Sequence, residues 1–212
     1  MNYLKNKIVI VTGSSGSIGM EIAKHFSSLG CKVVITGRNE QTIKNVAVEC
    51  KSNSPHNYEP LQVVCDLANE ENIKNLISKT IDVFGKLNIL VNNAAIDKQN
   101  CFGDINLLTD FDEQLTVNVR AVLQLCQLAM PYLIESKGSI VNISAIQKPS
   151  CSCKYEFLEN YDELKSFFEQ KNVLKRMLEP FEIASCVAFL ASDRSSFTTG
   201  ISLNLDGGEL LM

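Results

Sequence analysis

The feature that most constrains the fold is a regular alternation of short apolar runs with longer amphipathic segments. Five runs consist almost entirely of apolar residues: Lys7–Val11, Lys32–Thr36, Leu61–Cys65, Leu87–Val91 and Ser139–Ile143. Runs without a polar face predict strands that are covered on both sides, as in a parallel sheet. The intervening segments fit helices: Ile18–Leu29, Glu40–Lys51, Asn69–Phe84 and Leu107–Glu135. This order predicts right-handed βαβ units, and hence an α/β fold with a doubly wound parallel sheet.

The alternation fails after the fifth run. Between Ala145 and Glu179 there is no strand-like run. The later segments that fit helices are Tyr161–Phe168, Asn172–Leu178 and Phe181–Ala191, and a last strand fits Ile201–Leu205. We expect residues 1–212 to form a single domain in which one helix–strand unit is missing before the last strand.

Composition excludes several classes of protein. The net charge of -4 argues against sequence-independent binding to nucleic acid, which requires a basic surface. The early apolar run Ile8–Val11 is too short for a signal peptide, and no stretch approaches the roughly 20 apolar residues that span a bilayer. We therefore expect a cytoplasmic protein without a membrane span.

The eight cysteines do not predict a metal site or a disulfide framework. Six are scattered singly among apolar segments, as reduced core thiols are. Cys151 and Cys153 form a C-x-C pair, which is not zinc-ligand spacing, and both histidines are distant in sequence.

A glycine-rich turn follows the first predicted strand and reads Thr12-Gly13-Ser14-Ser15-Gly16-Ser17-Ile18-Gly19. Glycines let the backbone approach a pyrophosphate, and the start of the next helix offers free N–H groups to its oxygens. The residues expected to contact a dinucleotide here are Gly13, Ser15, Gly16, Ser17, Ile18 and Gly19.

This turn resembles the T-G-x-x-x-G-x-G loop of the short-chain dehydrogenases/reductases, with Ser17 where the family more often has glycine. Asn92–Ala95 is similar to the family's N-N-A-G, with Ala95 replacing glycine, and Arg176–Ala184 is similar to R-x-x-x-P-x-E-I-A. The resemblance implies a Rossmann-like oxidoreductase that transfers hydride between a nicotinamide and a small carbonyl or alcohol substrate. It also implies that Asn93 and Ala94 line the adenosine side of the cofactor.

Two residues bear on the cofactor. Arg38 follows the second strand, where NAD-binding folds place a carboxylate for the ribose 2′-hydroxyl. A guanidinium suits a 2′-phosphate, so NADP is expected, although NAD is possible and Arg38 could simply be solvated. Asp66, with Leu67, follows the third strand; the resemblance implies contact with adenine, and capping of the next helix is an equal alternative.

The resemblance also implies a catalytic set of serine, tyrosine, lysine and asparagine. Ser144, at the end of the fifth strand, matches the serine, and Asn118, within the long helix, matches the asparagine that anchors a water. Outside this framework, residues of both types usually cap helices or bond locally.

The tyrosine and lysine should follow as Tyr-x-x-x-Lys. Tyr161 and Lys165 have this spacing, but acidic residues follow the tyrosine, and no long helix, strand and turn come after them. Tyr155 has no lysine four residues on. We interpret Tyr161–Lys165 as a coincidental match and expect the proton-transfer pair to be absent.

Three hypotheses remain open: an active NADP(H)-dependent enzyme that uses Tyr161 and Lys165, a catalytically dead relative that binds dinucleotide or partner chains, and the product of an incomplete message. The substrate cannot be read from the sequence. The missing helix is one that the family uses between subunits, so the usual oligomer is doubtful.

Overall fold

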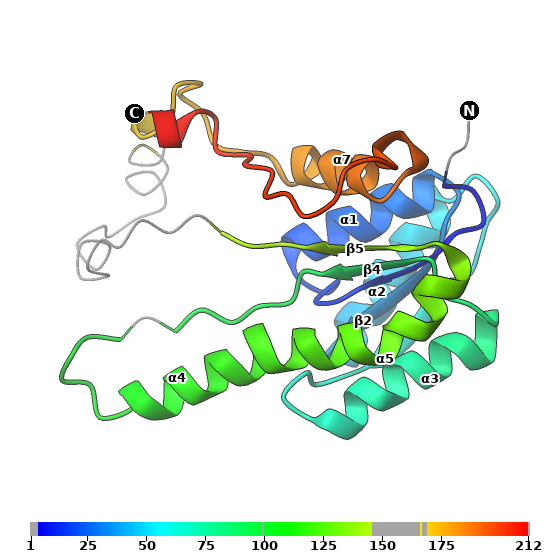
Figure 1. Cartoon of the computed structure of the whole chain (residues 1–212), viewed down its shortest axis with the longest axis horizontal. Helices are drawn as coiled ribbons and strands as arrows, with labels where there is room; N and C mark the ends of the chain where they lie inside the picture. Colours follow the sequence, from blue (N-terminus) through cyan, green and yellow to red (C-terminus); the bar gives the residue numbers. More distant parts are fainter. Residues whose placement is uncertain (1–3, 99, 146–165, 167–168, 212) are drawn as a thin grey trace.

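The centre of the molecule is a parallel sheet. The computed structural model describes residues 4–98, 100–145, 166 and 169–211. Its strands are β1 (Ile8–Val11), β2 (Lys32–Gly37), β3 (Leu61–Val64), β4 (Ile89–Asn92) and β5 (Ser139–Asn142). All neighbours pair in parallel, in the order β3-β2-β1-β4-β5 (Figure 1). The predicted doubly wound parallel sheet is confirmed.

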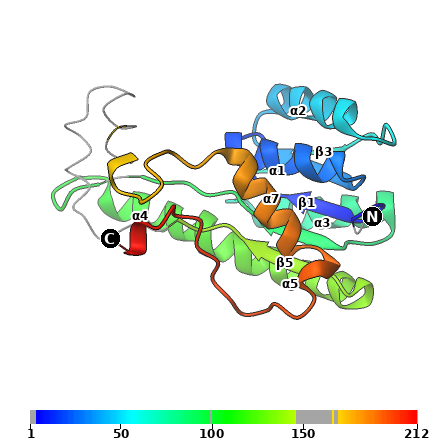
Figure 2. The same ribbon diagram turned by 90° about the horizontal axis from the view of Figure 1, so that it is seen from above.

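Helices cover both faces of this sheet (Figure 2). One face carries α1 (Ser17–Ser28), α2 (Glu40–Asn53) and α7 (Pro180–Leu190), and the other carries α3 (Glu70–Phe84) and α5 (Ala121–Ser136). The alternation along β1 shows how the two layers are separated. Val9 and Val11 pack with the first set of helices, whereas Ile8 and Ile10 pack with the second. All four side chains are buried, which explains why this strand has no polar face.

The strand order places a crevice at one end of the sheet. β1 lies between β2 and β4, so the chain leaves β1 towards one neighbour and returns later to pair on the other side. Ligands of open parallel sheets bind at the carboxyl ends of the strands at such a switch point.

Local signals explain several helix boundaries. Asn39 precedes α2, and its side chain accepts a hydrogen bond from Thr42 N at 2.9 Å. Asn69 precedes α3 and accepts from the N–H groups of Glu71 and Asn72. Gly30 follows α1 with a φ of 80°, a conformation that costs glycine little.

The predicted long helix has the expected extent but contains a wider turn. It consists of α4 (Leu107–Leu115), the π turn η1 (Thr116–Arg120) and α5. The side chain of Asn118, inside the π turn, exchanges hydrogen bonds with a backbone 22 residues away, as described below. Single π turns inside α-helices are frequently found at functional sites.

By length and composition alone, the stretch Leu107–Ser136 could cross a membrane. It has 30 residues, and its most apolar window has a mean hydropathy of 1.2 and is 22% buried. A helix that packs on a sheet passes the same test. Leu125 and Ala129 from this stretch are fully buried against the sheet.

Two expectations for the C-terminal part are wrong. Asn172–Leu178 is not helical: Lys175 has a φ of 52°, and Val173 N bonds to Gly207 O at 2.9 Å rather than within a helix. Ile201–Leu205 is not a strand, and all five of its residues are exposed. Figures 1 and 2 show this segment passing outside β5 without joining the sheet. A strand requires a hydrogen-bonded ladder with a neighbour, and this segment forms none with β5, the edge strand of the described sheet.

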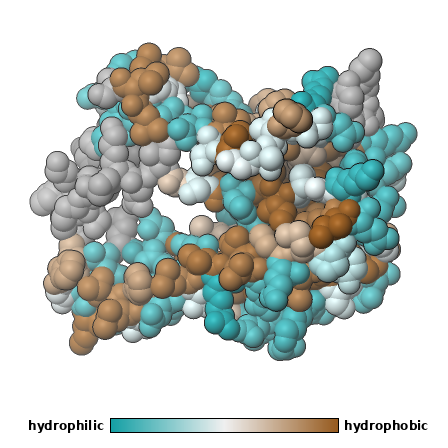
Figure 3. Space-filling view, viewed as in Figure 1, coloured by the Kyte–Doolittle hydropathy of each residue, from teal (hydrophilic) through white to brown (hydrophobic). Residues whose placement is uncertain are grey.

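Much apolar surface remains exposed in the described part of the chain. Figure 3 shows hydrophobic residues gathered along α4. Leu108 and Phe111 of α4 are 74% and 52% exposed, and Phe197 and Ile201 are also exposed.

Candidate active site

A cleft of about 370 Å³ opens at the carboxyl ends of β1 to β4. Every residue that the sequence predicted to contact a dinucleotide lines it: Gly13, Ser15, Gly16, Ser17, Ile18, Gly19, Arg38, Asp66, Leu67, Asn93 and Ala94. Further residues that were not predicted from the sequence also line the cleft: Thr36, Gly37, Cys65, Ala95, Ile96 and Val117. Gly37, Cys65 and Ala95 each adjoin a predicted residue, so extending each motif by one residue would have found these three.

The glycine-rich loop is fixed to β2 by Ser14. This buried side chain accepts a hydrogen bond from Thr36 N at 2.8 Å and donates one to Thr36 O at 3.2 Å. Both backbone groups of Thr36 are thus tied to the loop, and the loop and the end of β2 form one wall of the cleft.

The loop passes close to its neighbours at Gly19. A Cβ atom on Gly19 would lie 2.4 Å from Gly13 O and 2.6 Å from Asn93 Nδ2. Gly16, by contrast, precedes α1 with a φ of -90°, and a Cβ there would meet only Gly13 O at 3.4 Å. Ser17 is the exposed first residue of α1, so its side chain fits where the family more often has glycine.

Thr12 fixes the loop to the end of β4. Its hydroxyl accepts hydrogen bonds from Asn93 N at 2.9 Å and Ala94 N at 3.0 Å, and it donates to Val91 O at 3.3 Å. Asn93 Nδ2 in turn donates to Thr12 O at 2.8 Å. The loop is therefore held from both sides, with the amino end of α1 facing the cleft.

At the other end of the cleft, Arg38 is exposed and makes no ion pair with any described residue. Asp66 is also exposed, and its Oδ1 accepts from Ala68 N at 3.0 Å. Since Asn69 caps α3, the alternative that Asp66 caps this helix is wrong. Burial raises the pKa of the Cys65 thiol to about 11, so the thiol is not a ready nucleophile.

The loop suits a dinucleotide phosphate. The glycines permit close approach, and the first N–H groups of α1 have no partner within the helix. These features fit the cofactor that the sequence predicts.

The structure does not bring both predicted catalytic residues to the cleft. Asn118 lies beside it, between Val117, which lines the cleft, and Val119. Its side chain is engaged at both ends, because Oδ1 accepts from Ile96 N at 2.9 Å and Nδ2 donates to Ile96 O at 2.8 Å. Ser144 is exposed after β5 and does not line the cleft.

Several residues that the sequence analysis considered lie outside the described residues: Tyr155, Tyr161, Lys165, Cys151 and Cys153. Within the described part of the chain, no three His, Cys, Asp or Glu side chains are grouped so that they could hold a metal ion.

Two family models match the chain in succession. The model described as short chain dehydrogenase matches residues 7–153, and one described as enoyl-(acyl carrier protein) reductase matches residues 152–209. The two matches meet at residues 152 and 153.

Among curated proteins, the chain is 33% identical over 148 residues to an uncharacterized oxidoreductase of Staphylococcus epidermidis. This comparison covers 69% of the chain but only 61% of that relative. The chain is 30% identical to the 3-oxoacyl-(acyl-carrier-protein) reductase FabG of Rickettsia bellii, with 99% of both proteins covered. That comparison runs over 250 positions and this chain has 212 residues, so at least 38 positions have no residue in this chain.

Solved structures share the fold. A 7α-hydroxysteroid dehydrogenase in complex with NADH and 7-oxo glycochenodeoxycholic acid has a TM-score of 0.87 at 24% identity, covering 98% of this chain and 96% of that one. A short-chain dehydrogenase/reductase mutant of Serratia marcescens has a TM-score of 0.86 at 24% identity, covering 98% and 99%. The family match over residues 7–153, together with the 30% identity to FabG over 99% of both proteins, shows that the chain belongs to the short-chain dehydrogenase/reductase family.

Proposed function

We propose that the chain is an NADP(H)-dependent oxidoreductase that acts on a carbonyl or alcohol carbon, and that its turnover is impaired. The observation that carries this proposal is that a single cleft gathers every residue expected to contact the dinucleotide. The names of two similar proteins support an oxidoreductase, but not the choice of NADP: one is a reductase of 3-oxoacyl groups, and the other is a dehydrogenase in complex with NADH.

The residues of the cleft suggest how the cofactor would be held. The N–H groups at the start of α1 would bind the pyrophosphate, and the exposed guanidinium of Arg38 would bind a 2′-phosphate. When bound, the nicotinamide supplies or accepts the hydride, and the protein must position the substrate and manage one proton.

The proton-transfer step is where impairment is expected. Ser144 is exposed and does not line the cleft. At least 38 positions of the FabG comparison have no residue here, and the two family matches meet at residues 152 and 153. A deficit of this size is consistent with loss of one helix–strand unit, which spans about 30 or more residues with its connections.

We also propose that the protein acts in the cytoplasm and does not bind nucleic acid. Its net charge of -4 and its six described free cysteines support this. Loss of a helix that relatives use between subunits would remove the family's usual oligomer.

Cofactor choice can be tested by titrating NADPH and NADH into the protein and into Arg38→Gln. The variant should bind NADPH about 10- to 100-fold more weakly and NADH unchanged, because only NADPH offers a 2′-phosphate to the guanidinium. Arg120→Gln is a matched control: Arg120 is exposed, pairs with Glu70 and does not line the cleft. Equal effects of Arg38→Gln on both dinucleotides would contradict the proposed preference.

Turnover is tested separately with NADPH and a panel of aldehydes and ketones. The proposal predicts slow turnover that survives Tyr161→Phe. Turnover lost in Tyr161→Phe would identify Tyr161 as the proton donor and refute our interpretation of that pair. NADPH binding without any turnover would refute the oxidoreductase proposal and favour a dinucleotide-binding relative without activity.

A further inference from the structure

A ladder of side-chain contacts joins the segment after β4 to the long helix. At the first rung, Asn118 exchanges two hydrogen bonds with the backbone of Ile96, at 2.9 and 2.8 Å. At the second, Gln114 does the same with Lys98: Oε1 accepts from Lys98 N and Nε2 donates to Lys98 O, both at 3.2 Å. At the third, Asn100 Nδ2 donates to Asp110 Oδ2 at 3.1 Å.

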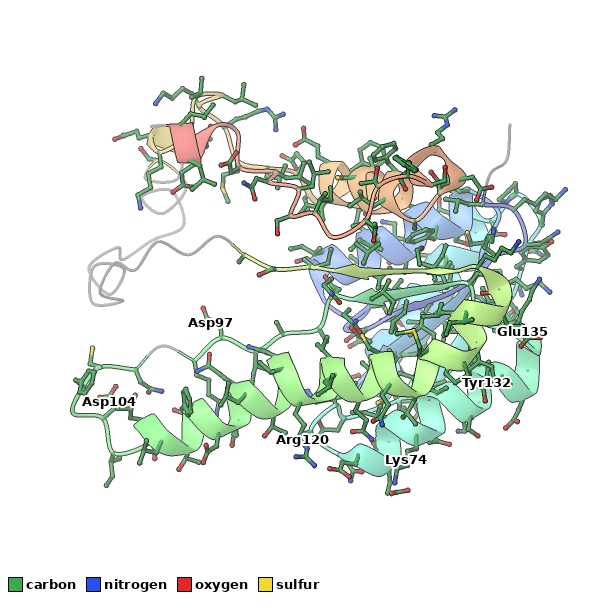
Figure 4. The ribbon with its side chains drawn as sticks, viewed as in Figure 1. Lys74, Asp97, Asp104, Arg120, Tyr132 and Glu135 are labelled. Atoms are coloured by element: carbon green, nitrogen blue, oxygen red, sulfur yellow. The ribbon has the colours of Figure 1, made fainter. Side chains whose placement is uncertain are left out.

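The spacing of the rungs follows from two periodicities. The helical partners are four residues apart and rise about 6 Å per step, since each helical residue adds about 1.5 Å. Their partners in the segment after β4 are two residues apart, and two residues of an extended chain advance about 6.6 Å. The two repeats nearly match, so each helical turn meets every second residue of the segment. Figure 4 shows the segment that carries Asp97 and Asp104 running along α4.

At the end of the ladder farther from the cleft, Lys98 forms two ion pairs with the helix. Lys98 Nζ contacts Asp110 Oδ1 at 2.6 Å and also contacts Glu113. The hydrogen bonds that Lys98 Nζ donates to Asp110 and Glu113 raise the pKa of Lys98, so its ammonium group stays charged at neutral pH. The same lysine thus bonds to the helix through its backbone and through its side chain.

The inner end of the ladder is part of the cleft. Ile96 and Val117 both line it, on either side of the Asn118 rung. A single side-chain amide at Asn118 fixes only one residue of an extended segment. The second rung, at Gln114, fixes the direction in which the segment leaves that residue.

We propose that Gln114 is a positioning residue: through its paired bonds to Lys98 it holds Ile96 in the wall of the cleft and so sets how tightly the dinucleotide binds. The binding half of this inference, that Gln114 affects the affinity for the dinucleotide, rests on the proposed function. The positioning half, that Gln114 holds Ile96 in place, does not.

The test compares Gln114→Leu with the wild type in two measurements, backbone amide exchange and NADPH affinity. Leucine is a good helix former, so the helix is kept while both bonds to Lys98 are lost. We expect faster exchange at Lys98 and also at Ile96, and NADPH binding that is about tenfold weaker. Gln114→Glu keeps an acceptor for Lys98 N and should restore slow exchange at Lys98 and most of the affinity.

Gln124→Leu is the matched control. Gln124 lies on α5, and its Nε2 makes a comparable bond to Glu70 O at 3.2 Å away from the cleft. This variant should leave exchange at Ile96 and NADPH affinity unchanged.

The inference is overturned if Gln114→Leu speeds exchange at Lys98 alone and leaves Ile96 and the NADPH affinity as in the wild type. If the wild type binds neither NADPH nor NADH, the proposed function fails and the binding half fails with it. Exchange at Ile96 then still decides the positioning half.

Discussion

At the scale of single residues, the shape of the cleft depends on positions where a side chain does not fit. The glycines of the loop are not equivalent. Gly19 faces the carbonyl of Gly13 so closely that a Cβ cannot enter, whereas Gly16 has space at an ordinary negative φ. Ser17 shows the same tolerance, because the first residue of α1 is exposed.

Gly19→Ala should therefore destabilise the protein by about 1–3 kcal/mol, as overpacking of a filled site does. The clash is with backbone atoms that also hold Asn93 in place, so cofactor binding should weaken as well. Gly16→Ala is the matched substitution and should change the free energy of unfolding little. Urea denaturation measures the free energy of unfolding of both variants. An equal loss in the two variants would contradict a steric clash at Gly19.

At the scale of helices and strands, the elements that could be predicted from the sequence are those whose signal lies in adjacent residues. The buried runs of β1, β2 and β4 were predicted because nearly every residue in them is apolar. The caps Asn39 and Asn69 were not predicted, although each directly precedes its helix. The π turn around Asn118 was not predicted, because its partner Ile96 lies 22 residues away and no local pattern announces the contact.

The strand predicted at Ile201–Leu205 is wrong for the opposite reason, because here a local signal is present but the pairing is not. Its alternating residues are compatible with a strand, but a strand also requires pairing across space, and this segment does not pair with β5, the edge strand of the described sheet. In the candidate site, the loop and strand-end residues were predictable because motifs fix them. Val117 and Gln114 act only through the packed helix, so their contribution was not.

The start of α7 gives a prediction about pH. Arg176 donates two hydrogen bonds to Glu182, at 2.7 and 2.6 Å, and Glu179 N donates a third at 3.0 Å. The Arg176 guanidinium and then the Glu179 amide lower the pKa of Glu182 to about 2. A carboxylate with a lowered pKa stabilises the fold above its ordinary value of 4.5, and this contribution is lost as the pH falls towards 2.

Glu182→Gln should thus be less stable than the wild type at pH 7, and the difference should shrink between pH 4.5 and 2. Thermal unfolding followed by circular dichroism across this range measures it. A difference independent of pH would mean that the charge of Glu182 does not contribute.

At the scale of the whole molecule, a well-packed sheet is joined to a loosely attached C-terminal part. Leu90 in β4 is 0% exposed between two helix layers, whereas Leu203 is 48% exposed outside β5. Leu90→Ala should cost about 2–5 kcal/mol, as large-to-small changes in cores do. Leu203→Ala should cost less than about 0.5 kcal/mol. A large cost at Leu203, measured by urea denaturation, would show that residues 201–205 join the sheet in solution.

Binding of NADP(H) in the cleft at the ends of β1 to β4 can be measured by backbone amide exchange with and without NADPH. We expect slower exchange on binding at Ser15, Ser17 and Ile18, which line the cleft at the glycine-rich loop. Unchanged exchange there at a saturating NADPH concentration, or protection confined to other parts of the chain, would contradict it.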